Sequence, residues 1–498
     1  MNQTPAVPIQ WPANRPTLGP VARAALVIVV ALVVYLATVA GGGVVFGALA
    51  LGALAGFLIW TRPIVGLVAL VVLGPPHQFL MVLVLHFTGS ATVLKVAEVW
   101  KDLVVVLLLA KAIDLAFHRK RPPTVYLLDL GIVIFMVMAA FYVFYPTDLA
   151  GSTLLVSVLG LRLDAFFLVA YFLGRGLTVT RRQVRLLLIA FFLITLVIAV
   201  VAVAQFVAPG AMNLVFNQLG YQDFIDLKLG TEGTNVAIRA NDFGGFVVPR
   251  ASSLVLSDLA LGFYTLLAAP LAAGLLLHFP RTRDRIVGNI ILLAAVGTAF
   301  LTVTRSAILA QIPALGTIML RARGAVYILL LLAEVTFAAM PVAYQLRINS
   351  SVIRAVFSPD NGSIQGHFAA LTDSLVVIRE NPLGRGLGTA GQIAQVADVQ
   401  GGITNEDWYL QLATEIGVVP ALVYLVIVVG FGVTAFARYG QARDPWVKTL
   451  CLGMAGATIG FGLVGFALHV WEAETISIIF WLFAGMVVQA PSIESEAG

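Results

Sequence analysis

The residue types most able to do chemistry gather in one polar interval, residues 346–410. The rest of the sequence is largely a succession of apolar segments, whereas this interval contains one histidine, several arginines and two adjacent carboxylates: His367, Arg347, Arg354, Arg379, Arg385, Glu406 and Asp407. Arginine presents a planar fork that matches phosphate oxygens, and its charge does not vary with pH. A carboxylate or an imidazole can accept the proton of an attacking hydroxyl. The interval therefore suits a phosphate- or diphosphate-bearing substrate and a positioned base.

A further arginine, Arg305, lies between the apolar stretches TAFLTVT and SAILAQI. A cation at the mouth of two apolar helices needs an anionic partner or ligand. We weigh an anionic ligand against a structural salt bridge or a contact with lipid headgroups. Similar alternatives apply to the other candidates, because His367 also fits a solvated loop histidine, and Glu406 and Asp407 also fit carboxylates at a helix N-terminus. All three of these residues stay candidates for the base.

The composition excludes a water-soluble globule, since 60% of the residues are hydrophobic and only 11% are charged, against about 25% charged residues in soluble domains. A formal charge of +5 without a basic run interleaved with aromatics argues against nucleic acid as a partner. The single cysteine, Cys451, excludes an intramolecular disulfide and a cysteine-built zinc or iron–sulfur site. We expect no metal and no cofactor. The polar, proline-containing beginning of the sequence predicts an uncleaved start.

The apolar segments predict an all-α, polytopic membrane protein with about 14 transmembrane helices. The predicted helices lie near residues 22–40, 44–60, 64–86, 93–117, 126–145, 155–175, 185–208, 254–278, 286–303, 306–320, 325–344, 408–436, 448–469 and 474–490. Gly74, Pro75 and Pro76 interrupt the third of these segments. Irregular backbone at such a depth requires cover from protein or water.

Basic residues predict the orientation, because translocation of Lys and Arg in short loops is disfavoured. They fall in alternate connections, at Arg62, residues 118–121, 181–185, 281–285, 321–323 and 438–448, which we expect on the cytoplasmic side with both termini. The predicted organisation is a cytoplasmic tail (1–21), N-terminal transmembrane helices (22–208), a first outer loop (209–253), central transmembrane helices (254–345), a large, partly helical periplasmic loop (346–407), C-terminal transmembrane helices (408–490) and a cytoplasmic tail (491–498). The arginines and the candidate bases then share the outer face, as glycosyl transfer from a polyprenyl diphosphate requires.

Three stretches resemble the signature region of the O-antigen ligase and O-antigen polymerase superfamily. They are TVTRSAILA (302–310), GHFAALTDSLVVIRENPLGRGLGTAG (366–391) and NEDWYLQLATEIGVVPALVYL (405–425). In that family a Ser/Thr-Arg-Ser/Gly turn precedes a large periplasmic loop, which contains Asn-Pro followed by three alternating glycines, here Asn381, Pro382, Gly384, Gly386 and Gly388, and leads into Y-L-x-x-x-x-E-x-G. Farther upstream, VVPRASSLVLSDLALGF (247–263) is similar to an earlier arginine-bearing outer loop of the family. The resemblance therefore runs from Val247 to Leu425.

The resemblance implies a glycosyltransferase at the periplasmic face of the bacterial cytoplasmic membrane that uses undecaprenyl-diphosphate-linked glycans. The family's essential outer arginines map onto Arg250 and Arg305. As a hypothesis, these two, aided by Arg239 or Arg354 and with Arg385 as a further contact, hold the donor diphosphate. His367, Glu406 or Asp407 then deprotonates the acceptor hydroxyl, which attacks the anomeric carbon with inversion.

Two departures from the family pattern favour a repeat-unit polymerase over a ligase. Many ligases have His-Asn just before Tyr-Leu, where this chain has Glu406-Asp407, and many members have an arginine where this chain has His367. A chain-length regulator is an open question for a polymerase. The rival from another class is a transporter or lipid-linked-glycan flippase, which would place charges within its spans. Few charges do so, among them Arg162, Asp164 and Glu334. A structural membrane scaffold is the third alternative.

Overall fold

The computed structural model describes residues 43–118, 124–144, 153–229, 238–242, 247–279, 281–321, 335, 362–397, 399, 402–403 and 405–495. Nearly all of their regular structure is helical, and one two-stranded hairpin is the exception among them. The predicted all-α class is therefore confirmed for the part of the chain that the structure describes. The predicted tail 1–21, the predicted helix 22–40, the predicted helix 325–344 apart from residue 335, and Arg347 and Arg354 lie outside the described residues.

The N-terminal part contains α2 (Gly43–Thr61), α3 (Pro63–Leu73), α4 (His77–Thr88), α5 (Ala91–Glu98), α6 (Trp100–Phe117), α7 (Leu127–Phe141), α8 (Leu154–Ala165), η1 (Phe166–Leu168), α9 (Val169–Gly176) and α10 (Arg181–Val207). The middle of the chain contains α11 (Pro209–Gln218), α12 (Tyr221–Leu229), β1 (Arg239–Asp242), β2 (Val247–Arg250), η2 (Ser253–Val255), α13 (Asp258–His278), α14 (Thr282–Leu301) and α15 (Arg305–Met319). The last part contains α18 (Gly362–Glu380), α19 (Gly391–Val396), α20 (Trp408–Ile416), α21 (Val418–Gln441), α22 (Pro445–Val464), η3 (Val470–Glu472), α23 (Glu474–Val488) and α24 (Ala490–Ser495).

Six of the described helices are long and apolar enough to cross a membrane, or seven if the bent pair Gly52–Thr61 and Pro63–Leu73 forms one span. The six are Leu154–Gly176, Arg181–Val207, Asp258–His278, Thr282–Leu301, Val418–Gln441 and Pro445–Val464. Together they indicate a multi-pass membrane protein. The predicted number of 14 spans is not reached in the described residues, partly because predicted segments are broken or short.

The breaks have local causes. The predicted segment 64–86 divides at Gly74-Pro75-Pro76 into α3 and α4, because proline lacks the N–H that continues a helix. The predicted segment 408–436 divides at Gly417, whose φ of +91° is a left-handed conformation. Segment 93–117 divides at Val99 into α5 and α6. The helices α7 and α23, each of 15 residues, are shorter than a typical span.

The centre of the bundle is formed by α13, α22 and α23, whose side chains are mostly buried. Close helix contacts depend on small residues there, as they do in membrane bundles generally. A Cβ added at Gly485 of α23 would lie 2.1 Å from the carbonyl oxygen of Tyr171 in α9. Beside α23, Trp471 stacks on Phe167 with ring centroids 6.0 Å apart, so aromatic rings fill the space near the start of α23.

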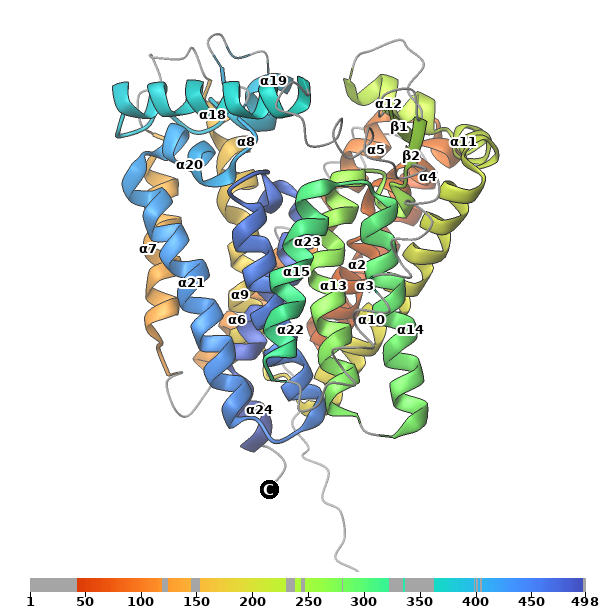
Figure 1. Ribbon diagram of the computed structural model, residues 1–498, viewed down its shortest axis with the longest axis vertical. Helices are drawn as coiled ribbons and strands as arrows, with labels where there is room; N and C mark the ends of the chain where they lie inside the picture. The colour runs from red at the N-terminus through yellow and green to blue at the C-terminus, as the bar shows by residue number, and fades with distance from the viewer. Residues whose placement is uncertain are drawn as a thin grey trace, which may run out of the picture.

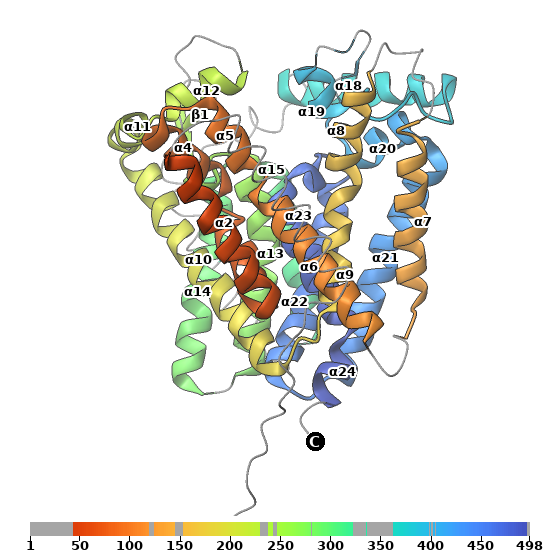
Figure 2. The same ribbon diagram turned by 180° about the vertical axis from the view of Figure 1, so that it is seen from behind.

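The bundle has two unlike ends (Figures 1 and 2). The hairpin, α11, α12, α18 and α19 lie at one end, and α18 runs across the helix axes; the other end contains α24 and the connections between α13 and α14 and between α21 and α22. At that second end the Arg181 guanidinium donates to the carbonyl of Glu494, whose carboxylate accepts from the backbone N–H of Arg443 at 2.7 Å. The arrangement thus gathers basic connections at one end and the two polar intervals, as far as they are described, at the other.

Candidate functional site

The first predicted outer loop, residues 209–253, contains α11, α12 and the hairpin, and the sequence analysis did not predict the hairpin. Its two strands are antiparallel, and Arg239 is the direct partner of Arg250 in the register. Residues opposite each other in such a pair lie about 4.5–5.5 Å apart at their Cα or Cβ atoms. The backbones of Arg239 and Arg250, two of the predicted diphosphate-binding arginines, therefore lie side by side.

Arg250 fastens this hairpin to the turn that precedes α15. Its Nε donates to the carbonyl of Thr302 at 3.1 Å, one of its terminal nitrogens donates to the Thr304 hydroxyl at 3.3 Å, and its guanidinium forms an ion pair with Asp258. The backbone N–H of Ala251 donates to the carbonyl of Leu301 at 2.9 Å. With its side chain only 18% exposed and engaged on three sides, Arg250 fixes the turn that leads to Arg305.

The turn itself is in an unusual backbone conformation. Val303 has a φ of +53°, and Ser253 and Leu256 on the facing segment have φ values of +51° and +57°. Such conformations cost about 1–3 kcal/mol each in residues with a Cβ, and they cluster at functional sites. Gln205 of α10 supports the facing segment, because its side-chain oxygen accepts from the backbone N–H groups of Ser252 and Ser253.

Arg305 is the first residue of α15. A cation at this position opposes the partial positive charge of a helix N-terminus, so helix stability alone does not favour it. The guanidinium and the first N–H groups of the helix are together suited to an anion. This position makes Arg305 a candidate ligand for a phosphate group.

His367 and Glu406, which are well separated in the sequence, are in direct contact with each other. The His367 Nδ1 lies 2.6 Å from a carboxylate oxygen of Glu406, and each side chain is 42% exposed. His367 lies in α18, which packs on α20, the helix that Glu406 precedes by two residues. The packing of α18 across the end of the bundle therefore creates the pair.

The electrostatics of the pair extend to two further residues. The hydrogen bond with Glu406 raises the pKa of His367, although partial burial and the positive charge of Arg305 act in the opposite direction. The same hydrogen bond lowers the pKa of Glu406, and the charge of His469 acts in the same direction. Arg305 and His469 are therefore close enough to interact electrostatically with the pair. The structure brings together three of the predicted residues, His367, Glu406 and Arg305, and adds His469, which the sequence analysis did not select.

Asp407 has a different position. Its side chain caps α20 by accepting from the backbone N–H of Leu410 at 3.0 Å. Burial raises the pKa of Asp407, while the backbone N–H groups of Leu410 and Tyr409 act against that rise. The capping alternative therefore accounts for Asp407.

Arg385 belongs to the glycine-containing loop, residues 381–390. Its backbone N–H donates to the carbonyl of Thr414, and the N–H of Gly386 donates to the carbonyl of Glu415, both at 2.8 Å. Thr414 is eight residues beyond Glu406, which is about 12 Å along a helix. The backbone of Arg385 thus lies beside the far end of α20, away from the His367–Glu406 pair.

The glycines of that loop have a packing role. Gly384 has a φ of +86°, and a Cβ added there would lie 2.5 Å from the carbonyl oxygen of Glu415 and 2.6 Å from the nitrogen of Gly417. Only glycine fits this conformation and this approach. The two glycine-bearing motifs that the sequence analysis singled out, NPLGRGLG and ATEIGV, therefore meet each other at the break between α20 and α21.

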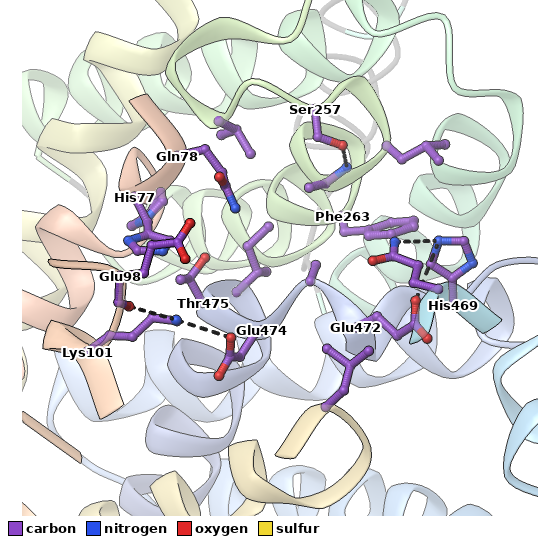
Figure 3. Close-up of a pocket in the computed structure, with 18 of the residues that line it drawn as sticks. His77, Gln78, Glu98, Lys101, Ser257, Phe263, His469, Glu472, Glu474 and Thr475 are labelled. Atoms are coloured by element: carbon purple, nitrogen blue, oxygen red, sulfur yellow. Dashed lines mark hydrogen bonds and ion pairs between the residues drawn. The ribbon is translucent and has the colours of Figure 1, made fainter. Parts of the chain in front are cut away.

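A cavity of about 420 Å³ has His469 in its wall (Figure 3). It is lined from α4, α5, α6, α8, α12, η2, α13, α19 and the segment from His469 to Ile476. The acidic and basic side chains at its wall, histidines aside, are Glu98, Lys101, Arg162, Lys228, Glu472 and Glu474. The sequence analysis noted Arg162 as a charge within a span but did not predict this cluster. The sequence did contain a signal for this cluster, because charged residues inside or at the ends of apolar segments mark functional or structural sites.

A buried ion-pair network forms one wall of the cavity. The Lys101 Nζ lies 3.2 Å from the Glu474 carboxylate, and Arg162 lies 2.8 Å from Asp102 and 3.1 Å from Glu474. The Lys101 side chain is 5% exposed, and those of Asp102 and Glu474 are 12% exposed. Nearer the surface, Lys228 pairs with Glu98 at 3.4 Å.

His469 lies at the border between the cavity and the His367–Glu406 pair. It lines the cavity, its Nε2 lies 3.3 Å from the side-chain nitrogen of Gln392, and it interacts electrostatically with Glu406. His469 therefore links the wall of the cavity to the electrostatics of the His367–Glu406 pair. In the described residues no group of three or more His, Cys, Asp and Glu side chains is arranged to hold a metal ion.

Comparisons with known proteins add no assignment: no protein-family model matches the chain, and the search of curated proteins gave no significant match.

Proposed function

We propose that the chain is an inverting membrane glycosyltransferase that polymerises undecaprenyl-diphosphate-linked oligosaccharide repeat units into O-antigen, capsular polysaccharide or exopolysaccharide. The observation that supports it most is the His367–Glu406 pair, with its 2.6 Å contact, within the electrostatic range of Arg305. A base and a phosphate-binding cation at one site are the two parts that transfer from a diphosphate donor needs.

In the proposed mechanism, Arg305 and the N-terminus of α15 bind the diphosphate of the donor, and Arg250 positions the turn. The acceptor hydroxyl oxygen attacks the anomeric carbon from the face opposite the diphosphate. The new glycosidic bond forms as the bond to the diphosphate oxygen breaks, which inverts the configuration. His367 takes the hydroxyl proton, and Glu406 stabilises the imidazolium that forms.

The same proposal places the end of the molecule with α18 and the hairpin at the periplasmic face of the bacterial cytoplasmic membrane. The support is the gathering of the basic connections at the opposite end, as the positive-inside rule expects for the cytoplasmic side. Within the same superfamily, an O-antigen ligase that transfers finished glycan to a terminal acceptor is the alternative.

A second candidate, a lipid-linked-glycan flippase or transporter, is favoured by one observation. The Lys101, Arg162 and Glu474 network lines a cavity inside the bundle, as the charges of transporters often do. This candidate does not require the His367–Glu406 pair to take part in chemistry.

The deciding experiment deletes the gene in a producing strain and restores it as wild type, Arg305→Ala or Arg379→Ala. Arg379 is an exposed arginine in the last turn of α18 and is the matched control. We expect Arg305→Ala to reduce polymer formation by about 10²–10³-fold, on the scale of a lost charge-stabilising donor, and Arg379→Ala to leave it unchanged.

The lengths of the lipid-linked glycans separate the alternatives. Single repeat units that accumulate on the carrier in the deletion strain indicate a polymerase, and full-length chains stranded on the carrier indicate a ligase. If the purified protein moves lipid-linked sugar across liposome bilayers without a change in glycan length, it is a flippase. Glycan that is unchanged by deletion refutes the proposed function.

A further inference from the structure

The charges around the cavity are balanced. Its cations are Lys101, Arg162 and Lys228, and each one has a carboxylate partner within 3.4 Å: Glu474, Asp102 and Glu98. An anionic ligand would meet no excess positive charge there and would have to compete with these carboxylates for the same donors. The cavity therefore differs from the Arg305 end of the site, where a cation lies at a helix N-terminus.

The other polar groups at the wall are neutral. His77 accepts a hydrogen bond at Nδ1 from the Trp100 indole at 3.0 Å, which assigns its proton to Nε2 and leaves the ring uncharged. Burial raises the pKa of Glu472 to about 8, so its carboxyl group is mainly protonated at pH 7. Burial also lowers the pKa of His469. With Gln78, Gln392 and Thr475, the wall presents many donors and acceptors and no net charge.

Two buried atoms at this wall have no hydrogen-bond partner among the described residues, the His469 Nδ1 and the Glu472 Oε2, although the latter lies 3.8 Å from the His469 Nε2. The Glu472 side chain is 1% exposed, and its other oxygen accepts from the Gln411 amide at 2.7 Å. An unpaired buried polar atom costs about 1–3 kcal/mol, so a ligand that supplies a hydroxyl at this position gains that interaction. Phe263, which also lines the cavity beside His469 (Figure 3), offers an apolar ring face to the same ligand.

We propose that the cavity binds a neutral saccharide unit through its hydroxyl groups. A sugar hydroxyl both donates and accepts, which matches a charge-balanced wall of mixed donors and acceptors. The volume of about 420 Å³ lies in the range of small-molecule sites, roughly 300–1,000 Å³. The identification of this saccharide as part of the lipid-linked glycan, presented next to His367 and Glu406, rests on the proposed function; the binding itself does not.

The test uses the full chain, purified in detergent, and saturation-transfer difference NMR, which detects weak ligand binding. The probes are glucose, galactose, mannose and N-acetylglucosamine, with glucuronate as a probe of similar size that adds one negative charge. Inorganic diphosphate is followed separately by the broadening of its ³¹P lines. We expect at least one neutral sugar to bind and to bind more tightly than glucuronate.

Two substitutions connect binding to the cavity. Thr475→Met adds volume at the wall without changing a charge, and Thr475→Val keeps the size of the side chain. We expect Thr475→Met to weaken sugar binding by about tenfold or more, since a wrongly filled site costs over 1 kcal/mol, and Thr475→Val to weaken it far less. If Thr475→Met does not fold, as judged by its elution and melting, Ala260→Met fills the cavity from α13.

The outcomes are distinct. The inference is overturned if no neutral sugar binds. It is also overturned if glucuronate or diphosphate binds more tightly than the neutral sugars and Thr475→Met abolishes that binding. Sugar binding that is insensitive to both cavity-filling variants also overturns it. Sugar binding that His367→Ala leaves intact, in a protein without glycosyl transfer, would retain the saccharide site and reject the proposed reaction.

Discussion

The network of Lys101, Asp102, Arg162 and Glu474 allows a sharp test, because Lys101, Asp102 and Glu474 are nearly excluded from solvent, whereas the side chain of Arg162 is 39% exposed. Lys101→Met leaves Arg162 with two carboxylates, and Glu474→Gln leaves Lys101 and Arg162 with one. In each single variant one charge remains unbalanced in a site where the Lys101 side chain is only 5% exposed. Loss of one partner of a buried ion pair costs about 3–5 kcal/mol, and we expect that cost for each single variant.

The double variant Lys101→Met, Glu474→Gln should lose less unfolding free energy than either single variant. It leaves the Arg162–Asp102 pair, with its 2.8 Å contact, electrically balanced. Removal of both partners of a buried pair is often close to neutral. The free energy of unfolding would be measured in mixed micelles with increasing SDS, followed by tryptophan fluorescence.

The matched control is Lys228→Met. The side chains of Lys228 and Glu98 are 42% and 35% exposed, so this ion pair is screened by solvent and its loss should cost less than about 1 kcal/mol. Additive losses in the double variant, or a loss in Lys101→Met as small as that in Lys228→Met, would refute the view of the cluster as one buried, balanced unit.

Three further predictions concern the site and its supports. If His367 is the base, activity rises as the pH passes the pKa of His367. Because Glu406 raises that pKa, Glu406→Gln should move the rising limb of the pH–rate profile to lower pH. A limb that does not move would show that the His367–Glu406 pair does not act in catalysis. Gly384→Ala should destabilise the protein by about 1–3 kcal/mol or more, because Gly384 has a left-handed φ and close contacts. In contrast, Gly366→Ala, in open space on α18, should stabilise the protein by up to about 1 kcal/mol. Equal melting temperatures of the two variants would contradict both expectations. Asp407→Ala should cost about 1 kcal/mol as a lost helix cap, and Asp407→Asn much less; a large loss of activity in Asp407→Asn with unchanged melting would instead make Asp407 catalytic.

The apolar segments of the sequence were sufficient to predict the helical class and several helices to within a few residues. The predicted segments 254–278 and 448–469 correspond to α13 (Asp258–His278) and α22 (Pro445–Val464). Such prediction depends on local composition, which the sequence contains directly. The predicted start at residue 185 was late for α10, which begins at Arg181 because Thr180 and Gln183 form a capping box.

The site was predictable only in its residue types. His367, Glu406 and Arg305 were selected as chemically capable, but the contact between His367 and Glu406 results from α18 packing on α20, two distant segments of the chain. The hairpin that pairs Arg239 with Arg250 has no alternating hydrophobic pattern in the sequence to indicate it. The Lys101 and Glu474 wall joins a segment from the first quarter of the chain to one near its end, so single-segment reasoning could not assemble it.

The packing of Gly384 against Gly417 has a consequence for the order in which the protein is built. A chain is synthesised from its N-terminus, so the loop of residues 381–390 leaves the ribosome before the helix break against which it packs. That loop cannot dock until α20 and α21 have been made and inserted. A nascent chain that stops before residue 405 would lack Glu406 and this docking surface, so we expect the candidate site to be completed only at a late stage of membrane insertion.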